Sequence, residues 1–418
     1  MSACLRHNGC DTLMLGFDHD LRRLGFAGNS CQIILELSAA VDPKVVEKRV
    51  TELVRQNPIL TSRPARVWTP QWKPTRTIPQ IRVHLETEAL AQNLLNEPLE
   101  IRRGELIRFD LAGNKLIFTW SHALMDAKSA EYFLACIGNE NLTVPEPGDD
   151  WYAQRGNRAG NLRARFRKAW QSLERLETFT PAAPVSLATH RKPAARTMKY
   201  KIISLSAEDS IRARANAARL GGFLGDTNFH LAAALMELHQ LHEQVSCPSA
   251  SYVVPVPVGL RPKGTRAPLF SNQVTMILHQ FFPGQLATIE TAITAFKIQQ
   301  AGCLREDQID AGVTLGQLFR KIPLAIYMRL VKQALRGEIC SLFFGDTGAA
   351  DPALENFLDT RIENLFHIPA VTFSPGIGVV FNRFREQLRF TVVYADGALT
   401  EIETAEFTKC LRERLLNP

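Results

Sequence analysis

Ser121, His122 and Asp126 are polar residues that stand where a continuous apolar run of the sequence ends and a periodic one begins. The run from Leu116 to Trp120 predicts a strand buried on both faces. The periodic segment that starts at Ala127 predicts a helix, with Asp126 at its entry. An imidazole at the end of a buried strand is well placed to act as a general base, because the rigid strand fixes its position. The alternative is structural, with His122 satisfied near the core and Asp126 serving only as an N-cap.

The spacing His-x-x-x-Asp carries little weight by itself, because it occurs twice in the chain. His7 and Asp11 form the second copy. They lie in a polar segment that contains glycine and follows no apolar strand. We interpret this copy as a chance match.

The composition is that of a globular protein with more than one core. A chain of 418 residues predicts two domains of roughly 200 residues each. Hydrophobic and charged contents of 45% and 22% argue against disorder. No apolar run has the length of a signal peptide or a membrane span, so we expect a cytoplasmic protein.

The cysteines give no sign of a zinc framework or a disulfide scaffold, since none of them forms a CxxC pair. We therefore expect a reduced chain and no metal site. The eight are Cys4, Cys10, Cys31, Cys136, Cys247, Cys303, Cys340 and Cys410.

The net charge of +7 favours anionic partners, namely phosphates, acidic proteins or a lipid surface. No helix-turn-helix, RNP-like or zinc-finger signature is present, so we expect no nucleic-acid partner. The basic charge is concentrated at 155–199, which holds eleven Lys or Arg and two acids, Glu174 and Glu177.

Residues 161–176 of this basic segment have the pattern of an amphipathic helix. Leu162, Phe166, Ala169, Leu173 and Leu176 fall on one face of it. Two interpretations are open: a solvated helix packed on a lobe with its charges outward, or a docking face for an anion. The anion would be a phosphate group, an acidic protein, or a membrane surface that the protein contacts peripherally.

The order of apolar patterns and breaker residues predicts an α/β protein in two parts. Residues 1–178 would form an N-terminal lobe with the HxxxD motif, 179–195 a Pro/Ala linker, and 196–418 a C-terminal lobe. Expected strands lie at 31–37, 81–85, 116–120, 198–205, 252–258, 272–282 and 339–344, with a pair at 377–394. Expected helices lie at 42–57, 88–96, 227–242, 288–301 and 315–336, with others after Asp126, Ser206 and Thr400, and the chain start is read as rich in turns.

Five short stretches resemble motifs of one superfamily. Their order and spacing also match, and together they extend along essentially the whole chain. They are Asn57–Leu60, Leu116–Asp126 (against HHxxxDG), Pro255–Arg261, Leu269–Gln273 and Cys340–Gly345. The chain resembles the CoA-dependent acyltransferases that include chloramphenicol acetyltransferase, condensation domains, wax ester synthases and plant BAHD enzymes. The resemblance implies two chloramphenicol-acetyltransferase-like lobes, with a tunnel between them and His122 midway along it.

The resemblance also implies an activity. His122 would act as the general base that deprotonates a hydroxyl or amine as it attacks an acyl thioester. The donor would be acyl-CoA or a phosphopantetheine-linked acyl group, and no permanently bound cofactor would be needed. The anion at the basic helix would then be an acidic acyl-carrier protein or the phosphates of CoA.

Supporting roles follow for other residues. Asp126 would pair with an arginine and hold the loop that presents His122. Arg63 and Arg261 are the candidates, and Arg63 is slightly favoured. Asn272 and Ser341, together with Ser121, would bind substrate along the tunnel or polarise the thioester carbonyl. The alternative for Asn272 and Ser341 is that they satisfy backbone groups at strand ends.

The motif departs from the family pattern at two positions, since Ser121 replaces the first histidine and Ala127 replaces the glycine. The plant DFGWG signature is absent, which favours the condensation or wax-ester branch over BAHD enzymes. Three functions therefore stay open. The chain is an acyltransferase, a stand-alone condensation enzyme that forms amides, or a catalytically silent member that acts as a binding subunit.

Overall fold

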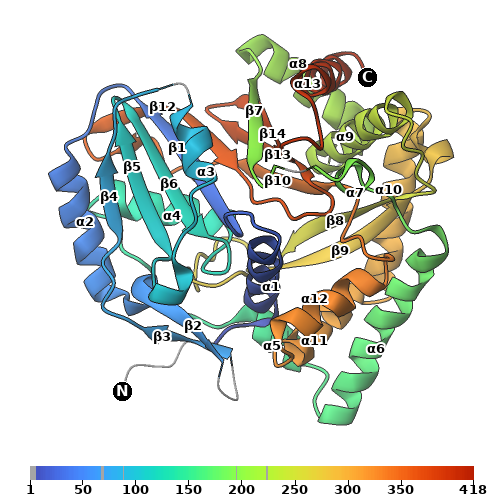
Figure 1. Cartoon of the computed structure of the whole chain (residues 1–418), viewed down its shortest axis with the longest axis horizontal. Coiled ribbons are helices and arrows are strands. Elements are labelled where there is room, and N and C mark those ends of the chain that lie inside the picture. The colour runs from blue at the N-terminus through green and yellow to red at the C-terminus, as the bar shows by residue number, and fades with distance from the viewer. Residues whose placement is uncertain (1–5, 67–69, 88, 194, 223–224) are drawn as a thin grey trace.

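Two separate β-sheets, each covered by helices, give the molecule its two lobes (Figure 1). The structure is a computed structural model that describes residues 6–66, 70–87, 89–193, 195–222 and 225–418. Cys4 lies outside the described residues, and the other seven cysteines are free thiols. The expected α/β class and two-lobed architecture are confirmed.

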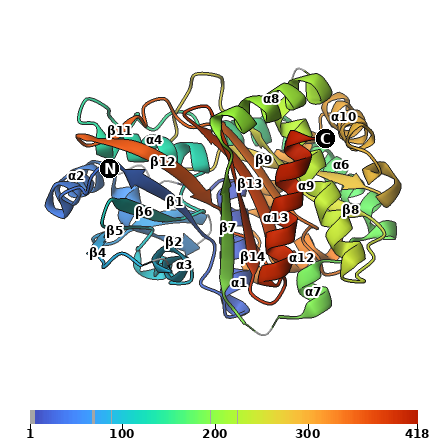
Figure 2. The same ribbon diagram turned by 90° about the horizontal axis from the view of Figure 1, so that it is seen from above.

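The N-terminal lobe is built on a six-stranded sheet with the order β11-β12-β1-β6-β5-β4. Only β4 and β5 pair in parallel, and the other neighbours are antiparallel. Helices α2 and α4 cover one face and α3 lies on the other (Figures 1 and 2). The bounds are β1 Ser30–Leu37, β4 Gln80–Val83, β5 Ile107–Ala112, β6 Lys115–Ser121, β11 Asn356–Phe357, β12 Thr360–Ile368, α2 Pro43–Gln56, α3 Leu90–Leu95 and α4 Ala127–Gly138. A hairpin of β2 Ser62–Arg66 and β3 Pro70–Pro74 lies below this sheet.

The C-terminal lobe contains a four-stranded sheet with the order β10-β13-β14-β7 and a separate antiparallel pair, β8 and β9. Helices α8, α9 and α13 pack on the sheet (Figure 2). The strands are β7 Met198–Ser204, β8 Tyr252–Gly259, β9 Val274–Phe281, β10 Phe343–Ala349, β13 Ile377–Phe384 and β14 Gln387–Ala395. The helices are α7 Leu187–Arg191, α8 Ala207–Gly221, α9 Gly225–Gln244, α10 Ile289–Arg305, α11 Gln308–Phe319, α12 Leu324–Gln333 and α13 Glu401–Leu416.

Two segments lie in the lobe opposite to the one expected from their sequence position. Strand β12 comes from the C-terminal half of the chain but pairs with β1, with Gln32 opposite Ile368. Helix α6 (Leu162–Phe179) comes before the linker but packs on α11 of the C-terminal lobe, as does α5 (Trp151–Asn157). The division at 178 and 196 therefore does not assign every element to its lobe.

The first helix, α1 (Gly9–Arg23), replaces the turns expected near the chain start. Its glycines serve close packing. A Cβ added at Gly9 would lie 2.5 Å from the backbone carbon of Gly316 in α11. The absence of a side chain at Gly9 lets the two helices approach closely.

Two other expectations differ in detail. The helix expected at 315–336 is interrupted into α11 and α12, because Pro323 stands at the N-cap of α12 and cannot continue the preceding helix. The strand expected from Ile339 begins only at Phe343. Among the described residues no helix is long and apolar enough to cross a membrane, and no group of His, Cys, Asp or Glu has the arrangement of a metal site.

Candidate active site

The backbone of His122 is fixed by the central strands of the N-terminal sheet. Ser121 ends β6, which lies between β1 and β5, and it pairs with Ser30. The amide of His122 donates to the carbonyl of Asn29 over 3.0 Å. The expected position at the end of a buried strand is confirmed, and the side chain itself is partly exposed.

The imidazole of His122 favours its neutral form. Burial lowers its pKa below the usual 6.5, and this effect outweighs the raising effects of the Asp126 charge, the Asn272 side chain and nearby carbonyls. Nδ1 is buried and makes no hydrogen bond to the described residues. A neutral imidazole has one nitrogen without a proton, and that nitrogen can accept one.

Asp126 caps α4 and forms an ion pair with Arg261. Its Oδ2 accepts from Arg261 Nη1 over 2.7 Å and from the amide of Gln273 over 3.1 Å, and its Oδ1 accepts from the amide of Ser129 over 3.0 Å. Burial would raise the pKa of Asp126, but the Arg261 charge and these N–H donors lower it overall. Asp126 is thus ionised and fully used as an acceptor.

The preference for Arg63 as the partner of Asp126 is wrong. Arg63 lies exposed in β2, where it pairs in register with Lys73. Arg261 follows β8 in the C-terminal half, and its Nη2 also donates to Ser129 Oγ at 2.7 Å and to the Pro268 carbonyl at 2.8 Å. The ion pair therefore joins the loop after His122 to the segment that enters β9.

Asn272 connects His122 to the first helix. Its side-chain Nδ2 donates to the His122 carbonyl over 2.8 Å and to Asp11 Oδ1 over 3.0 Å, and its amide donates to the same Oδ1 over 2.8 Å. Asn272 is buried and does not line the large cavity described below. Its contacts fix the backbone of His122, and a role in substrate binding stays a prediction.

Asp11 accepts four hydrogen bonds, the others coming from the amide of Asn8 and the hydroxyl of Ser271. Burial raises its pKa to about 7, against the opposing effect of the Asn272 and Asn8 donors. The His7–Asp11 copy of the motif, read as a chance match, thus contributes one residue to the support of His122. The capping box between Asn8 and Asp11 was the signal that could have revealed α1.

The two remaining candidates make different contacts. Ser341 exchanges hydrogen bonds with the backbone of Val253: its Oγ accepts over 2.9 Å and its amide donates over 2.7 Å. These contacts agree with the structural alternative for Ser341, in which its side chain satisfies backbone groups at a strand end. The hydroxyl of Ser121 is buried and has no hydrogen-bond partner among the described residues.

An apolar cavity of about 520 Å³ lies beside this network. Its wall is formed by α1, α6, β9, α11 and α12, and His122 is not part of it. Cys10 and Leu13 line it from the helix that carries Asp11, and Val274 lines it directly after Gln273. Its size falls within the roughly 300–1,000 Å³ of small-molecule sites. The network that holds His122 therefore also forms part of the frame of the cavity.

Comparison with known proteins identifies the fold. No protein-family model and no curated protein sequence matches the chain. Among solved structures, the first condensation domain of the calcium-dependent antibiotic synthetase in complex with a substrate analogue is similar with a TM-score of 0.73 at 16% identity, covering 100% of this chain and 98% of that one. TRI3 trichothecene 15-O-acetyltransferase from Fusarium sporotrichioides gives 0.71 at 13% identity, over 98% and 95%. The epimerization domain of tyrocidine synthetase B gives 0.60 at 12% identity, over 99% and 95%. The chain has the fold that these proteins share, as the sequence motifs led us to expect.

Replacing Arg261 by alanine should destabilise the protein, because it leaves the buried Asp126 carboxylate without its counter-charge. We expect a loss of about 3 kcal/mol or more in the free energy of unfolding. Arg63→Ala is the matched control, and its effect should stay within about 0.5 kcal/mol. Denaturant titration of the three proteins measures both values. Equal losses in the two variants would contradict the assignment of the pair.

The pKa of Asp11 predicts a pH dependence of stability. The pKa of Asp11 is about 7 in the folded protein, above the ordinary 3.8. The folded protein therefore binds the Asp11 proton more tightly than the unfolded chain does. The contribution of Asp11 to the unfolding free energy should therefore decrease as the pH rises from roughly 4 to 7, by about 2–4 kcal/mol. Asp11→Asn should lack this decrease. Parallel unfolding curves of the two proteins across that range would show that Asp11 does not titrate there.

Proposed function

We propose that the protein is a thioester-dependent acyltransferase in which His122 is the general base. The observation that carries this proposal is a partly exposed imidazole with a lowered pKa, fixed at a strand end by contacts to both its carbonyl and its neighbouring aspartate. The fold shared with an O-acetyltransferase and with condensation domains supports it. Fold alone does not define a reaction, and the site geometry is therefore the main argument.

The proposed reaction needs one proton acceptor and no covalent intermediate. Nδ1 of His122 is buried, so Nε2 is the nitrogen that accepts the proton of an acceptor hydroxyl or amine. The oxygen or nitrogen lone pair attacks the thioester carbonyl, the new C–O or C–N bond forms, and the C–S bond breaks. The imidazolium then returns the proton to the thiolate, which leaves as a thiol.

Asp126, Arg261 and Asn272 are positioning residues in this proposal. The carboxylate oxygens of Asp126 accept hydrogen bonds from Arg261 and from two backbone amides. Asn272 holds the His122 carbonyl. Such contacts keep the base within the small tolerance that proton transfer requires.

The proposed donor is an acyl group on CoA or on a phosphopantetheine arm. A basic groove between α1 and α12 supports an anionic donor, since Arg23, Arg329, Lys332 and Arg336 line it beside a single acid, Asp20. Lys332 and Arg23 both pair with Asp20, at 2.5 Å and 3.1 Å, and the charges of Arg329 and Arg336 remain for phosphate. No permanently bound cofactor is required by the reaction.

A condensation enzyme is the second candidate, and the condensation-domain fold favours it. It would join two carrier-bound substrates through an amide, with the same role for His122. Turnover of acyl-CoA with a small alcohol or amine supports the first candidate, and a strict need for carrier-bound substrates supports the second. A protein that turns over neither class is the silent binding subunit considered from Ser121 and Ala127.

Replacing His122 by alanine should abolish most turnover without unfolding the protein. The expected loss in kcat is on the order of 10²–10⁴, the contribution of a positioned base. Thiol release from an acyl thioester measures it, and circular dichroism checks the fold. His190→Ala is the control, because His190 is exposed on α7.

The pH profile gives a second readout of the same variant. Because the pKa of His122 is lowered from 6.5, the acidic limb of kcat/KM should have its midpoint below pH 6.5. Residual activity of His122→Ala should lack this limb. Near-normal turnover by the folded variant, or an unchanged acidic limb, would show that another group is the base.

A further inference from the structure

Helix α6 exposes a row of apolar side chains where it extends beyond the body of the C-terminal lobe (Figure 1). Leu162, Phe166 and Trp170 are 60%, 58% and 57% exposed. Their spacing of four residues places them along one side of the helix. Ala169 is buried and Leu173 lines the cavity, so the apolar face expected from the sequence is only half covered.

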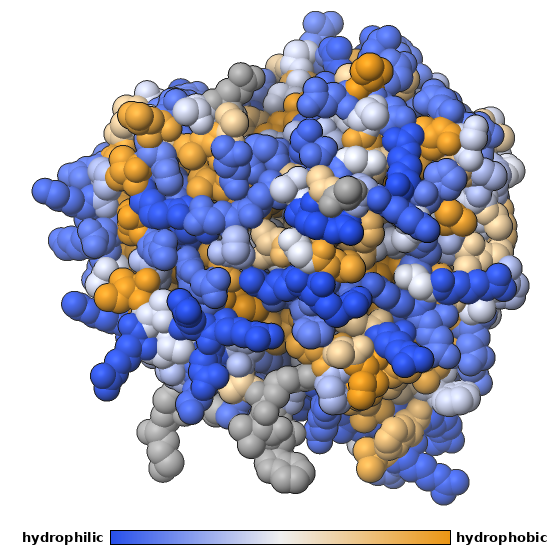
Figure 3. Space-filling model, in the orientation of Figure 1, coloured by the Kyte–Doolittle hydropathy of each residue, from blue (hydrophilic) through white to orange (hydrophobic). Residues whose placement is uncertain are grey.

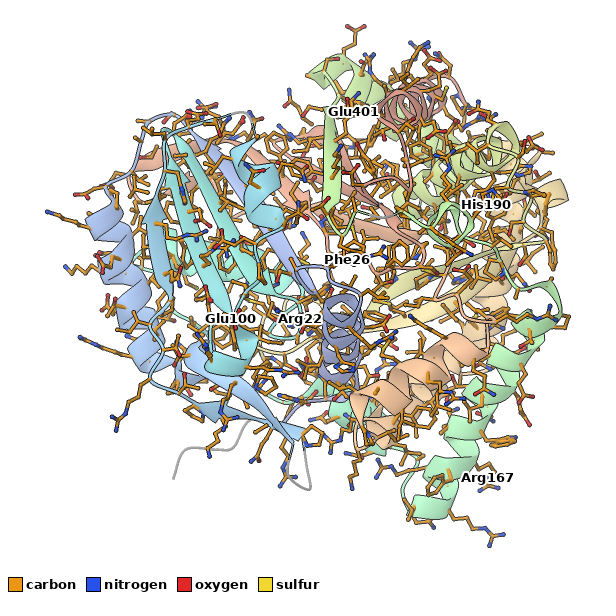
Figure 4. The ribbon with its side chains drawn as sticks, in the orientation of Figure 1. Arg22, Phe26, Glu100, Arg167, His190 and Glu401 are labelled. Carbon is orange, nitrogen blue, oxygen red and sulfur yellow. The ribbon has the colours of Figure 1, made fainter. Side chains whose placement is uncertain are left out.

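Basic side chains flank this apolar row. Arg163 and Arg167 are exposed, and Arg167 lies near the free end of the helix (Figure 4). The charge of Lys168 is already paired, since Lys168 forms an ion pair with Asp307. No acidic residue occurs between Leu162 and Leu173. The exposed end of α6 is therefore apolar on one side and positively charged beside it.

The same apolar row leads to the cavity. Trp170 belongs both to the exposed row and to the cavity wall. Leu330 of α12 also lines the cavity and is 39% exposed. Figure 3 shows hydrophobic side chains gathered over this part of the surface, at the lower right of the view. The cavity thus opens beside the apolar row of α6.

We propose that the N-terminal half of α6 docks the protein on an anionic lipid surface. Leu162, Phe166 and Trp170 would lie at the level of the lipid headgroups, with Arg163 and Arg167 against the phosphates. An apolar chain would pass from that surface to the cavity beside Trp170 without crossing water. This inference goes beyond the proposed function, and the docking step does not require catalysis.

The chemistry of the row favours lipid over an acidic carrier protein as the partner. A basic helix with Leu, Phe and Trp on its other side is the pattern of helices that lie in a membrane interface. Charge alone would suit either partner. The three large apolar side chains, continuous with an apolar cavity, need an apolar phase to cover them.

Vesicle sedimentation tests the proposal. The wild-type protein should sediment with phosphatidylcholine vesicles that contain phosphatidylglycerol, and much less with phosphatidylcholine alone or at high salt. Leu162→Ser/Phe166→Ser should weaken the partition coefficient at least about tenfold, since two apolar side chains are lost. Arg163→Glu/Arg167→Glu should do the same, because it reverses charge at the anionic surface.

Matched controls come from the opposite end of the lobe. Ile211 and Ile402 are 67% and 83% exposed on α8 and α13. Ile211→Ser/Ile402→Ser should therefore bind as the wild type does, as should Arg219→Glu/Lys409→Glu, which alters exposed charges on the same two helices. Trp170 is left unchanged in all variants because it lines the cavity.

Failure of this proposal is separable from failure of the proposed function. His122→Ala should bind vesicles normally, and the α6 variants should retain turnover of a short water-soluble thioester. Three results would overturn the docking surface: a wild-type protein that stays in the supernatant, α6 variants that sediment as the wild type does, or an α6-dependent complex with an acidic acyl-carrier protein without vesicle binding.

Discussion

The ion pair between Asp126 and Arg261 is the interaction on which the site depends. One carboxylate caps α4 directly after His122, and its partner lies in the segment between β8 and β9. Both side chains are largely removed from water, so neither charge is stable without the other. The position of the histidine loop is therefore coupled to the position of the segment that leads into β9.

A second set of hydrogen bonds reinforces that coupling from the chain start. Asn272 donates to both Asp11 and the His122 carbonyl. The next residue, Gln273, donates from its amide to Asp126 and from its side chain to Asp150, the N-cap of α5. Two consecutive residues thus hold α1, α5 and the histidine loop together. His122 owes its fixed position to segments from three distant parts of the sequence.

The parts of this site that sequence predicted are the local ones. An apolar run followed by His122 and a capping aspartate is a pattern within a dozen residues, and both the strand and the cap were found where expected. The choice between Arg63 and Arg261 depends on which arginine the tertiary fold brings near, and no local pattern contains that information. The same is true of Asn272, whose side chain contacts Asp11 and His122, 261 and 150 residues away in the sequence.

Helix α1 shows a different cause of failure. Its glycines and acids lower helix propensity, and Asp11 caps the helix while serving the site. Packing of Gly9 against Gly316 compensates for that low propensity, but it involves α11, which the sequence reading did not place beside the chain start. Ser121 remains a prediction, since its hydroxyl is buried and has no partner within the part of the chain that the structure describes.

The insertion of β12 into the N-terminal sheet has a consequence for the order in which the protein folds. Strand β1 lies between β6 and β12, and its pairing with β12 joins residues near opposite ends of the chain. During synthesis one edge of β1 therefore stays unpaired until almost the whole chain has emerged, and unpaired edges invite contact with other chains. The N-terminal lobe therefore cannot be completed as an independent unit ahead of the C-terminal one.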